Sequence, residues 1–339
     1  MPTKDLQKKK PTQYDVARHA GVSQAAVSYI LNNSTAISIP EETRQRVLAA
    51  MDELGYIPDR TARSLRTNKT YTIAAIIPDI TNPFYPTFVR GIQDITKQNA
   101  YDLVIYNSDG LLEEECQSLN SVEQNRVDGL IVVPFHLKEE DLLEIHIPVV
   151  QLIQKPSVPP ALDSVFIDNV AAARKVVNHL IERGHIRIGM IAGEENTPPR
   201  QNRILGYQQA IAEHHIPLDE ILIRGGDFTE KGGYETMQDL LKLSSPVTAV
   251  FAANDLMAMG ALTAIHEAGL RVPQDIAVAG LDDIPAAHLV TPSLTTITQY
   301  QQNIGQRAAE MLFERLNGSE TGTPRSIEMP FSLIVREST

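Results

Sequence analysis

The spacing of apolar residues along the chain changes at about residue 70. Before this point, apolar side chains recur three or four positions apart, as Val16 and Ala20 do, which is the period of an amphipathic helix. After it, short continuous apolar runs such as residues 73–78 alternate with stretches of helical period. Continuous runs of this length are typical of parallel strands that are buried on both faces. The pattern therefore predicts a small helical region followed by a larger α/β region.

The helical region is predicted to begin with two short helices and a tight turn over residues 12–32. Thr12 can cap the first helix, and Gly21 suits the left-handed position that follows it. Ser23 can cap the second helix, and Val27 belongs to its apolar stripe. Two helices joined by a glycine-containing turn form the helix-turn-helix unit, whose second helix enters the major groove of DNA. A helical hairpin without a DNA-binding role is the alternative.

The residues that follow favour the DNA-binding interpretation. A third helix is predicted from Pro40, with Gly55 after its end. Its apolar face is expected to be formed by Val47, Leu48, Met51 and Leu54. The segment Pro58–Arg66 begins with a proline and an acid and ends with basic residues, so it favours a helix, but one too short to be stable alone.

Motifs along nearly the whole chain resemble the lactose-repressor (LacI) family of bacterial transcription regulators. In the helical region these motifs are Asp15-Val-Ala-Arg-His-Ala-Gly-Val-Ser, Leu31-Asn-Asn, Glu42-Thr-Arg, Leu54-Gly-Tyr and Ala62-Arg-Ser-Leu65. Further along they are Ile77-Pro-Asp-Ile-Thr-Asn-Pro-Phe-Tyr85, Val127-Asp-Gly, Arg183-Gly-His185, Asn254-Asp255, Val272-Pro-Gln-Asp275, Thr291-Pro-Ser-Leu-Thr-Thr296 and Leu333-Ile-Val-Arg-Glu-Ser-Thr339. The chain looks like the sugar-responsive type, similar to ribose, galactose and catabolite repressors.

The resemblance implies a division of the chain and a set of DNA contacts. It implies a basic disordered arm at 1–11, a helix-turn-helix headpiece at 12–57, a hinge helix with linker at 58–70 and an effector-binding and dimerisation domain at 71–339. DNA contacts are expected from Thr12, Tyr14, Ser23, Gln24, Ala25, Ala26, Ser28, Tyr29, Asn32, Ala62, Leu65 and Arg66. A homodimer on a pseudo-palindromic, double-stranded operator is also predicted, because one headpiece reads only a few base pairs and a two-fold protein pairs naturally with a two-fold site.

Charge and cysteine content agree with this interpretation. The chain carries a net charge of −12, yet residues 1–70 hold eleven Lys/Arg against seven Asp/Glu. A basic headpiece on an acidic body concentrates the affinity for phosphates at one end. The single cysteine, Cys116, excludes a disulfide framework, and no Cys/His cluster has metal-ligand spacing. No metal, cofactor, signal peptide or membrane span is expected, so the sequence predicts a cytoplasmic protein.

The α/β region is predicted to alternate strands and helices. Strands are expected near 73–78, 103–107, 129–134, 149–153, 165–167, 187–192, 221–224, 248–253, 276–281, 295–298 and 331–335. Helices are expected near 84–99, 112–125, 139–145, 170–183, 203–214, 230–242, 255–268 and 304–316. Such alternation demands parallel, doubly wound sheets with helices on both faces. The resemblance implies two lobes, like a periplasmic sugar-binding protein, with three crossings between them: about 71–167 with 299–325, and 168–298 with 326–339.

Candidate effector residues follow the predicted strands. In open parallel sheets, ligands bind beyond the carboxyl ends of the strands. Those positions hold Asn82, Phe84, Tyr85, Asp168, Arg203, Phe228, Asn254, Asp282 and Gln299, with Asp109, Thr197 and Arg200 as weaker candidates. Aromatic rings can stack on the C–H face of a sugar, while the charged and amide groups bracket its hydroxyls. The alternatives are that Asn82 and Asp168 only cap helices and that Tyr85 belongs to the core; the run Glu113–Glu115 is interpreted as a solvated helix start.

Other classes of protein explain less of the chain. A periplasmic sugar-binding protein would account for the body but not for the headpiece. A dinucleotide-binding oxidoreductase would need a glycine-rich turn after the first strand, where residues 78–82 contain no glycine. No nucleophile–base pair for another enzyme is visible. The sequence therefore predicts a DNA-binding transcription regulator, interpreted as a repressor, whose DNA affinity is controlled by a sugar. A regulator that responds to a non-sugar metabolite or to a partner protein is the alternative.

Overall fold

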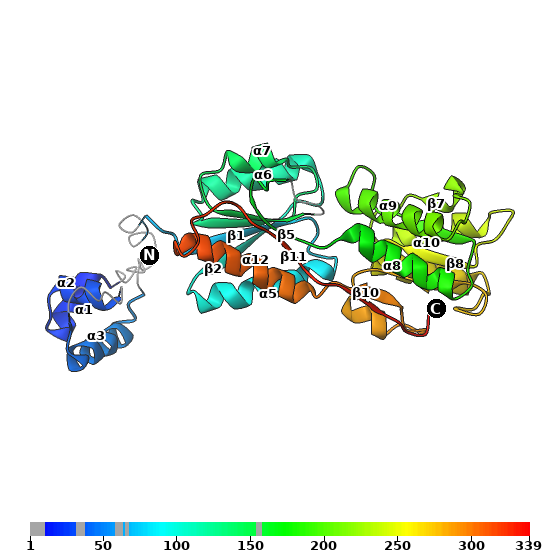
Figure 1. The fold of residues 1–339 in the computed structure, drawn as a ribbon. Helices are drawn as coiled ribbons and strands as arrows, with labels where there is room; N and C mark the ends of the chain where they lie inside the picture. Colours follow the sequence, from blue (N-terminus) through cyan, green and yellow to red (C-terminus); the bar gives the residue numbers. More distant parts are fainter. Residues whose placement is uncertain (1–10, 32–37, 58–63, 65–67, 154–157) are drawn as a thin grey trace, which may run out of the picture. The chain divides into compact units, whose positions relative to one another are not determined.

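The computed structural model describes residues 11–31, 38–57, 64, 68–153 and 158–339. The chain separates into two compact units, residues 1–70 and residues 71–339 (Figure 1). In the described part of the chain, no helix combines the length and the apolarity that crossing a membrane requires.

In its described residues, the first unit contains three short helices around a small core. They are α1 (Gln13–Ala20), α2 (Gln24–Leu31) and α3 (Glu41–Leu54). Thr12 and Asp15 form a capping box at the start of α1, and Gly21 ends it with φ 66°. The core is small because each helix buries only a narrow stripe. One predicted core position is wrong: Leu48 is 42% exposed, and Ala50 is buried in its place because it lies closer to the inward face of α3.

The second unit begins with a lobe built on a six-stranded parallel sheet. Its strands are β1 (Thr72–Ile77), β2 (Asp102–Asn107), β3 (Gly129–Val132), β4 (Val149–Ile153), β5 (Asp163–Phe166) and β11 (Ser326–Glu328), in the order β11-β5-β4-β3-β1-β2. Residues 73–77 of β1 are fully buried, which confirms the predicted central strand. This lobe is called the first lobe below.

Helices cover both faces of this sheet. One face is covered by α5 (Phe84–Gln98) and α12 (Gln301–Leu316), and the other by α6 (Leu112–Gln124) and α7 (Glu139–Leu143) (Figure 1). Two glycines let α5 and α12 approach closely. A Cβ on Gly91 would lie 2.0 Å from the Gln302 carbonyl oxygen, and one on Gly305 would lie 2.0 Å from that of Phe88.

The second lobe repeats the same architecture around a smaller sheet. Its parallel strands are β6 (Ile188–Ile191), β7 (Ile223–Arg224), β8 (Ala249–Ala252) and β9 (Ala277–Ala279), in the order β7-β6-β8-β9. A bridge between Ala279 and Thr295 places the antiparallel pair β10 (Thr296–Thr298) and β12 (Ser332–Ile334) beside β9. The helices α8 (Asn169–Glu182) and α9 (Pro198–Glu213) pack on one face, and α10 (Glu230–Leu241) and α11 (Asp255–Glu267) on the other.

The chain passes between the lobes three times, after β5, β10 and β11. Two sequence expectations differ here. Strand β11 was absent from the predicted strands, and because it pairs in parallel with β5, residues 326–328 belong to the first lobe rather than the second. Helix α9 begins at Pro198, five positions earlier than predicted, because proline is favourable in a first helical turn. Arg203 therefore lies in the second turn of the helix and not at its start.

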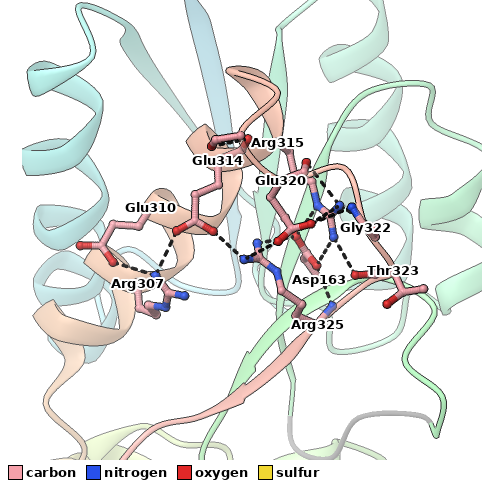
Figure 2. Close-up of polar contacts among 10 residues, drawn as sticks. Asp163, Arg307, Glu310, Glu314, Arg315, Glu320, Gly322, Thr323 and Arg325 are labelled. Carbon is pink, nitrogen blue, oxygen red and sulfur yellow. Dashed lines mark hydrogen bonds and ion pairs between the residues drawn. The ribbon is translucent and has the colours of Figure 1, made fainter.

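A network of arginine and carboxylate side chains holds the segment between α12 and β11 on the first lobe, just before the last crossing (Figure 2). Arg315 of α12 donates two hydrogen bonds of 2.8 Å to the Asp163 carboxylate at the start of β5. Arg325, just before β11, donates its backbone N–H to the same carboxylate at 2.8 Å. Burial acts to raise the pKa of Asp163, but these arginine bonds outweigh it and lower the pKa. The short strand β11 is thus held by long-range ion pairs.

Candidate DNA-binding surface and effector cleft

The exposed side of α2 forms the candidate DNA-binding surface of the first unit. Ser23 caps this helix, accepting a hydrogen bond of 3.1 Å from the Ala26 N–H. Val27 faces the core, whereas Gln24 and Ala25 are exposed. The remaining predicted contacts on described residues are also accessible to differing degrees: Thr12 and Tyr14 are exposed, and Ala26, Ser28 and Tyr29 are partly exposed. The predicted contacts Asn32, Ala62, Leu65 and Arg66, and with them most of the predicted hinge helix, lie outside the described residues.

The second unit encloses a cavity of about 460 Å³ beyond the carboxyl ends of the strands of both lobes. Every predicted effector residue except one lines it: Asn82, Phe84, Tyr85, Arg203, Phe228, Asn254, Asp282 and Gln299. A volume of this size suits a small-molecule ligand. In the described part of the chain, no three His, Cys, Asp or Glu side chains are arranged to hold a metal ion.

Asp168 is the predicted residue that does not line the cavity. Its side chain caps α8 by accepting a hydrogen bond of 2.9 Å from the Ala171 N–H, so the alternative interpretation of this residue is the one that the structure supports. The next residue, Asn169, lines the cavity instead. Among the weaker candidates, Asp109 lines the cavity, whereas Thr197 and Arg200 do not.

Arg203 is the central cation of the cavity. It is 6% exposed, and its Nε donates a hydrogen bond of 2.9 Å to the Asn169 side chain. Its Nη1 donates to the Ala253 carbonyl oxygen, and its Nη2 lies 4.0 Å from Asp282 Oδ1. Burial lowers the pKa of Arg203, while the negative charge of Asp282 acts in the opposite direction. The guanidinium is thereby held in one orientation within the cavity wall.

Asp282 is the buried carboxylate that faces this arginine. It is 4% exposed and accepts a hydrogen bond of 2.6 Å from the Gln299 side chain. The Gln301 side chain donates to its backbone carbonyl oxygen. Burial raises the pKa of Asp282 to about 8, although the charge of Arg203 opposes this rise. Its backbone has φ 136°, a conformation that favours glycine, and such strain is typical of ligand sites.

Aromatic side chains form much of the remaining wall. Phe84 and Tyr85 lie edge to face, with ring centroids 5.1 Å apart. Phe135 of the first lobe lies opposite Phe228 of the second, with ring centroids 6.5 Å apart. Phe135 was absent from the predicted site, although it lies just beyond a predicted strand end and the same rule could have found it. The other lining side chains that were not predicted include Asp79, Thr81, Asn169, Glu194, Asp227 and Thr229.

Glu115 corrects another expectation. The sequence pattern predicts a solvated helix start for the run Glu113–Glu115, yet Glu115 is fully buried. Its carboxylate accepts backbone N–H bonds from Phe135, His136 and Leu137 at 2.7, 3.0 and 2.8 Å. This position in the first turn of α6 faces the loop after β3, which the local sequence pattern does not reveal.

A helical unit with an exposed second helix, joined to a two-lobed α/β unit with a ligand-sized cleft, defines the class of ligand-responsive DNA-binding regulators. Comparison with known proteins agrees with this class. Residues 12–59 match the bacterial regulatory proteins of the lacI family, and residues 177–339 match the periplasmic binding protein-like domain.

Individual relatives match along almost the whole chain. The HTH-type transcriptional repressor CytR of Escherichia coli (strain K12) is 36% identical over 330 residues, which cover 97% of this chain and 96% of the relative. A solved complex of the transcriptional regulator CelR with cellobiose is 32% identical, with a TM-score of 0.74, covering 97% of this chain and 100% of that one. The lac repressor dimer bound to operator and an anti-inducer is 29% identical, with a TM-score of 0.86, covering 97% and 99%.

The chain belongs to the LacI family of bacterial transcription regulators. It is a DNA-binding regulator with a small-molecule effector, and its relatives are transcriptional repressors rather than enzymes. The expected fold, a helix-turn-helix region followed by a two-lobed domain with parallel sheets, is confirmed.

Proposed function

We propose that the effector is an uncharged sugar that binds in the cleft between the two lobes. The observation that carries this proposal is the buried pair of Arg203 and Asp282 in a cavity whose other walls hold the rings of Phe84 and Phe135. Charge-assisted hydrogen bonds from the pair can hold sugar hydroxyls, and the rings can cover the apolar C–H face. The solved CelR complex, a relative with cellobiose, supports a sugar in such a fold.

The charge of the cavity favours a neutral ligand over a phosphate ester. Among the described residues that line it, five carry carboxyl groups, Asp79, Asp109, Glu194, Asp227 and Asp282, and one, Arg203, is a cation. This arginine already binds Asn169 and the Ala253 carbonyl group. A phosphate would therefore enter a field of like charge, which disfavours its binding.

A calorimetric panel tests the proposed effector. Neutral pentoses, hexoses and disaccharides are titrated into the full chain beside the phosphate esters of the same sugars. At least one neutral sugar is expected to bind and its phosphate ester to bind more weakly. Tighter binding of the ester, or binding of none of the neutral sugars, would contradict the proposal.

DNA recognition is proposed to come from α2 in the major groove. Gln24, Ala25 and Tyr29 are accessible on this helix while Val27 is buried, so they are placed to contact base edges. Tyr29→Arg should change the operator sequence recovered in a binding-site selection, and Gln45→Ala, at an exposed residue of α3 outside the expected DNA contacts, serves as the comparison. An unchanged preference in Tyr29→Arg would remove this residue from base recognition. Because a bacterial DNA-binding regulator acts where the DNA lies, we propose that the protein works in the cytoplasm.

The segment Pro58–Arg66 is proposed as the hinge between DNA and effector. The proposal rests on its sequence, because these residues lie mostly outside the described ones. Leu65 is apolar between Arg63 and Arg66, a chemistry suited to wedging between base steps in the minor groove. Leu65→Ala should weaken operator binding and reduce DNA bending while sugar affinity in the DNA-free protein stays unchanged. Full affinity and full bending in a gel-shift assay would refute the hinge role.

A homodimer on a pseudo-palindromic operator is proposed for the assembly. Strand β2 lies at the edge of its sheet, and Val104 and Ile105 are 39% and 42% exposed. Leu111 and Leu112, at the start of α6, are also more than half exposed, so apolar side chains are accessible both on this edge strand and shortly after it. The solved lac repressor dimer on its operator supports the same assembly. Sedimentation should show Ile105→Lys as a monomer and Ile186→Lys, a 70% exposed apolar residue of the second lobe, as a dimer.

A further inference from the structure

We propose that Glu115 is a positioning residue for the effector cleft, whose buried carboxylate fixes the loop after β3 so that Phe135 closes the mouth of the cleft against Phe228. This inference rests on the proposal that the cleft binds the effector. It concerns a residue that does not itself line the cavity and acts only through the loop that it holds.

The Glu115 carboxylate makes an unusually complete set of bonds to this loop. Its Oε1 accepts the Phe135 N–H at 2.7 Å, and its Oε2 accepts those of His136 and Leu137 at 3.0 and 2.8 Å. Three successive backbone donors converging on one anion form a nest, which fixes the backbone that supplies them. The side chain is fully buried, so water does not compete for these bonds.

A second tie holds the same loop to the turn after β2. His136 Nε2 lies 2.8 Å from the Gly110 carbonyl oxygen, at hydrogen-bonding distance. Gly110 has φ 67°, the left-handed region that favours glycine. A Cβ at this position would lie 3.5 Å from the Phe135 ring and 3.7 Å from Glu194 Oε2 of the second lobe. The turn, the loop and the opposite lobe thus meet at one place.

The ring of Phe135 meets a partner that is fixed equally firmly. Its centroid lies 6.5 Å from that of Phe228, and the two rings are tilted by 52°. Phe228 rests on Gly193, where a Cβ would lie 1.9 Å from the ring, so only glycine permits this placement. The loop that Glu115 binds therefore fixes the position of the Phe135 ring, and the close approach to Gly193 in the second lobe fixes that of the Phe228 ring. The pair covers an edge of the cavity that both rings line.

Replacing Glu115 by glutamine isolates the electrostatic part of this arrangement. Glutamine has nearly the same size but only one acceptor oxygen, and its amide group would point N–H against N–H of the loop. Buried backbone donors would then lose their acceptor, and the loop is expected to shift to recover one. Glu113 lies in the same helical turn and is exposed, so Glu113→Gln removes an equal charge without touching the loop.

The first measurement is effector affinity, with the neutral sugar that binds the unsubstituted chain as the probe. Glu115→Gln and Phe135→Ala should each weaken binding about tenfold, and the double variant should bind no more weakly than either alone, because both remove the same ring contact. Glu113→Gln should bind as the unsubstituted chain does. Additive losses in the double variant would indicate a merely structural role for Glu115 and overturn the proposal.

The second measurement needs no effector. Phe135→Cys and Phe228→Cys are combined with Cys116→Ser, and dibromobimane cross-linking of the two thiols is followed in the ligand-free protein. Adding Glu115→Gln should slow cross-linking severalfold, whereas adding Glu113→Gln should not. Equal rates in both backgrounds overturn the proposal. If no sugar binds the unsubstituted chain, the proposed effector fails while cross-linking still decides the role of Glu115.

Circular dichroism establishes whether each variant is folded. If Glu115→Gln does not fold, Glu115→Asp retains the charge at a shorter reach and takes its place in both measurements. Phe135→Ala keeps the whole Glu115 network intact, so unchanged sugar affinity in this variant would by itself refute closure of the mouth by Phe135.

Discussion

The two lobes line the effector cleft with different proportions of apolar and polar side chains. The first lobe contributes more apolar and aromatic side chains, Pro78, Phe84, Tyr85, Val133, Phe135, Leu152, Ile153 and Ile304, than polar ones, Asp79, Thr81, Asn82 and Asp109. The second lobe contributes buried polar groups, among them Asn169, Arg203, Asn254 and Asp282, and these are held by bonds within the lobe, such as that from Arg203 to Asn169 and that from Asn254 to the Phe228 carbonyl oxygen. Only Pro199 and Phe228 add apolar surface from this side.

This difference predicts which lobe should contribute more to the free energy of effector binding. Polar groups that are already oriented bind a ligand without further ordering, and removing one leaves its partners buried without a bond. An apolar wall loses only the surface that the deleted atoms covered. Substitutions in the second lobe are therefore expected to reduce effector affinity more than those in the first.

Arg203→Ala should give the largest effect. Removing the guanidinium would leave the buried Asn169 side chain and the Ala253 carbonyl group without their donor, at a cost of about 1–3 kcal/mol for each group. Calorimetry should show a loss of effector affinity of at least about a hundredfold, with DNA affinity in the effector-free state near that of the unsubstituted chain. Arg200→Ala, one turn earlier on α9 and outside the cavity lining, is the matched control. Equal affinities in the two variants would contradict the polar role of the second lobe.

Asp282 should make the stability of the second lobe depend on pH. Burial raises its pKa from 3.8 to about 8, so between these values the folded chain holds a proton that the unfolded chain has released. The free energy of unfolding should therefore fall as pH rises through this window, by at most about 1.4 kcal/mol per pH unit from this carboxyl. Urea unfolding at several pH values should show a flatter dependence in Asp282→Asn. Parallel curves for the two proteins would show that Asp282 does not titrate there.

Phe84→Ala tests the apolar wall of the first lobe. Loss of an aromatic contact is worth about 1 kcal/mol, so affinity for the sugar should fall about fivefold. Phe84→Leu keeps apolar surface without a ring and should give a smaller loss. A loss in Phe84→Ala as large as that in Arg203→Ala would reverse the ranking of the two lobes.

Gln301→Ala should give the smallest effect. Its side chain donates to the backbone carbonyl oxygen of Asp282, where φ is 136°, and it lies at the start of α12 next to a crossing between the lobes. Loss of one hydrogen bond that supports the carboxylate is expected to weaken sugar binding about threefold. Gln302→Ala removes an exposed glutamine that bonds Asp94 and should leave affinity unchanged. Matching losses in the two variants would exclude a specific role for Gln301.

Features with a local cause could be read from the sequence. The cap at Thr12, the left-handed Gly21 and the buried strand at residues 73–77 all follow from neighbouring residues or from a short period. Most effector residues could be predicted in the same way. Residues that directly follow a predicted strand lie at the carboxyl edge of the sheet, which is where ligands bind in open parallel sheets. This rule placed Phe84, Arg203 and Asp282 in one cavity, although Phe84 and Asp282 are 198 residues apart along the chain.

Features with a distant cause were decided only by the tertiary structure. Asp168 and Asn169 are adjacent and both polar, yet only the turn of the backbone decides that the first caps α8 and the second lines the cavity. Strand β11 is three residues long, and it forms because β5 and two arginine–carboxylate contacts hold it. The burial of Glu115 likewise depends on a loop about twenty residues further along the chain. In each case the deciding energy comes from a partner remote in sequence, which local periodicity and composition do not contain.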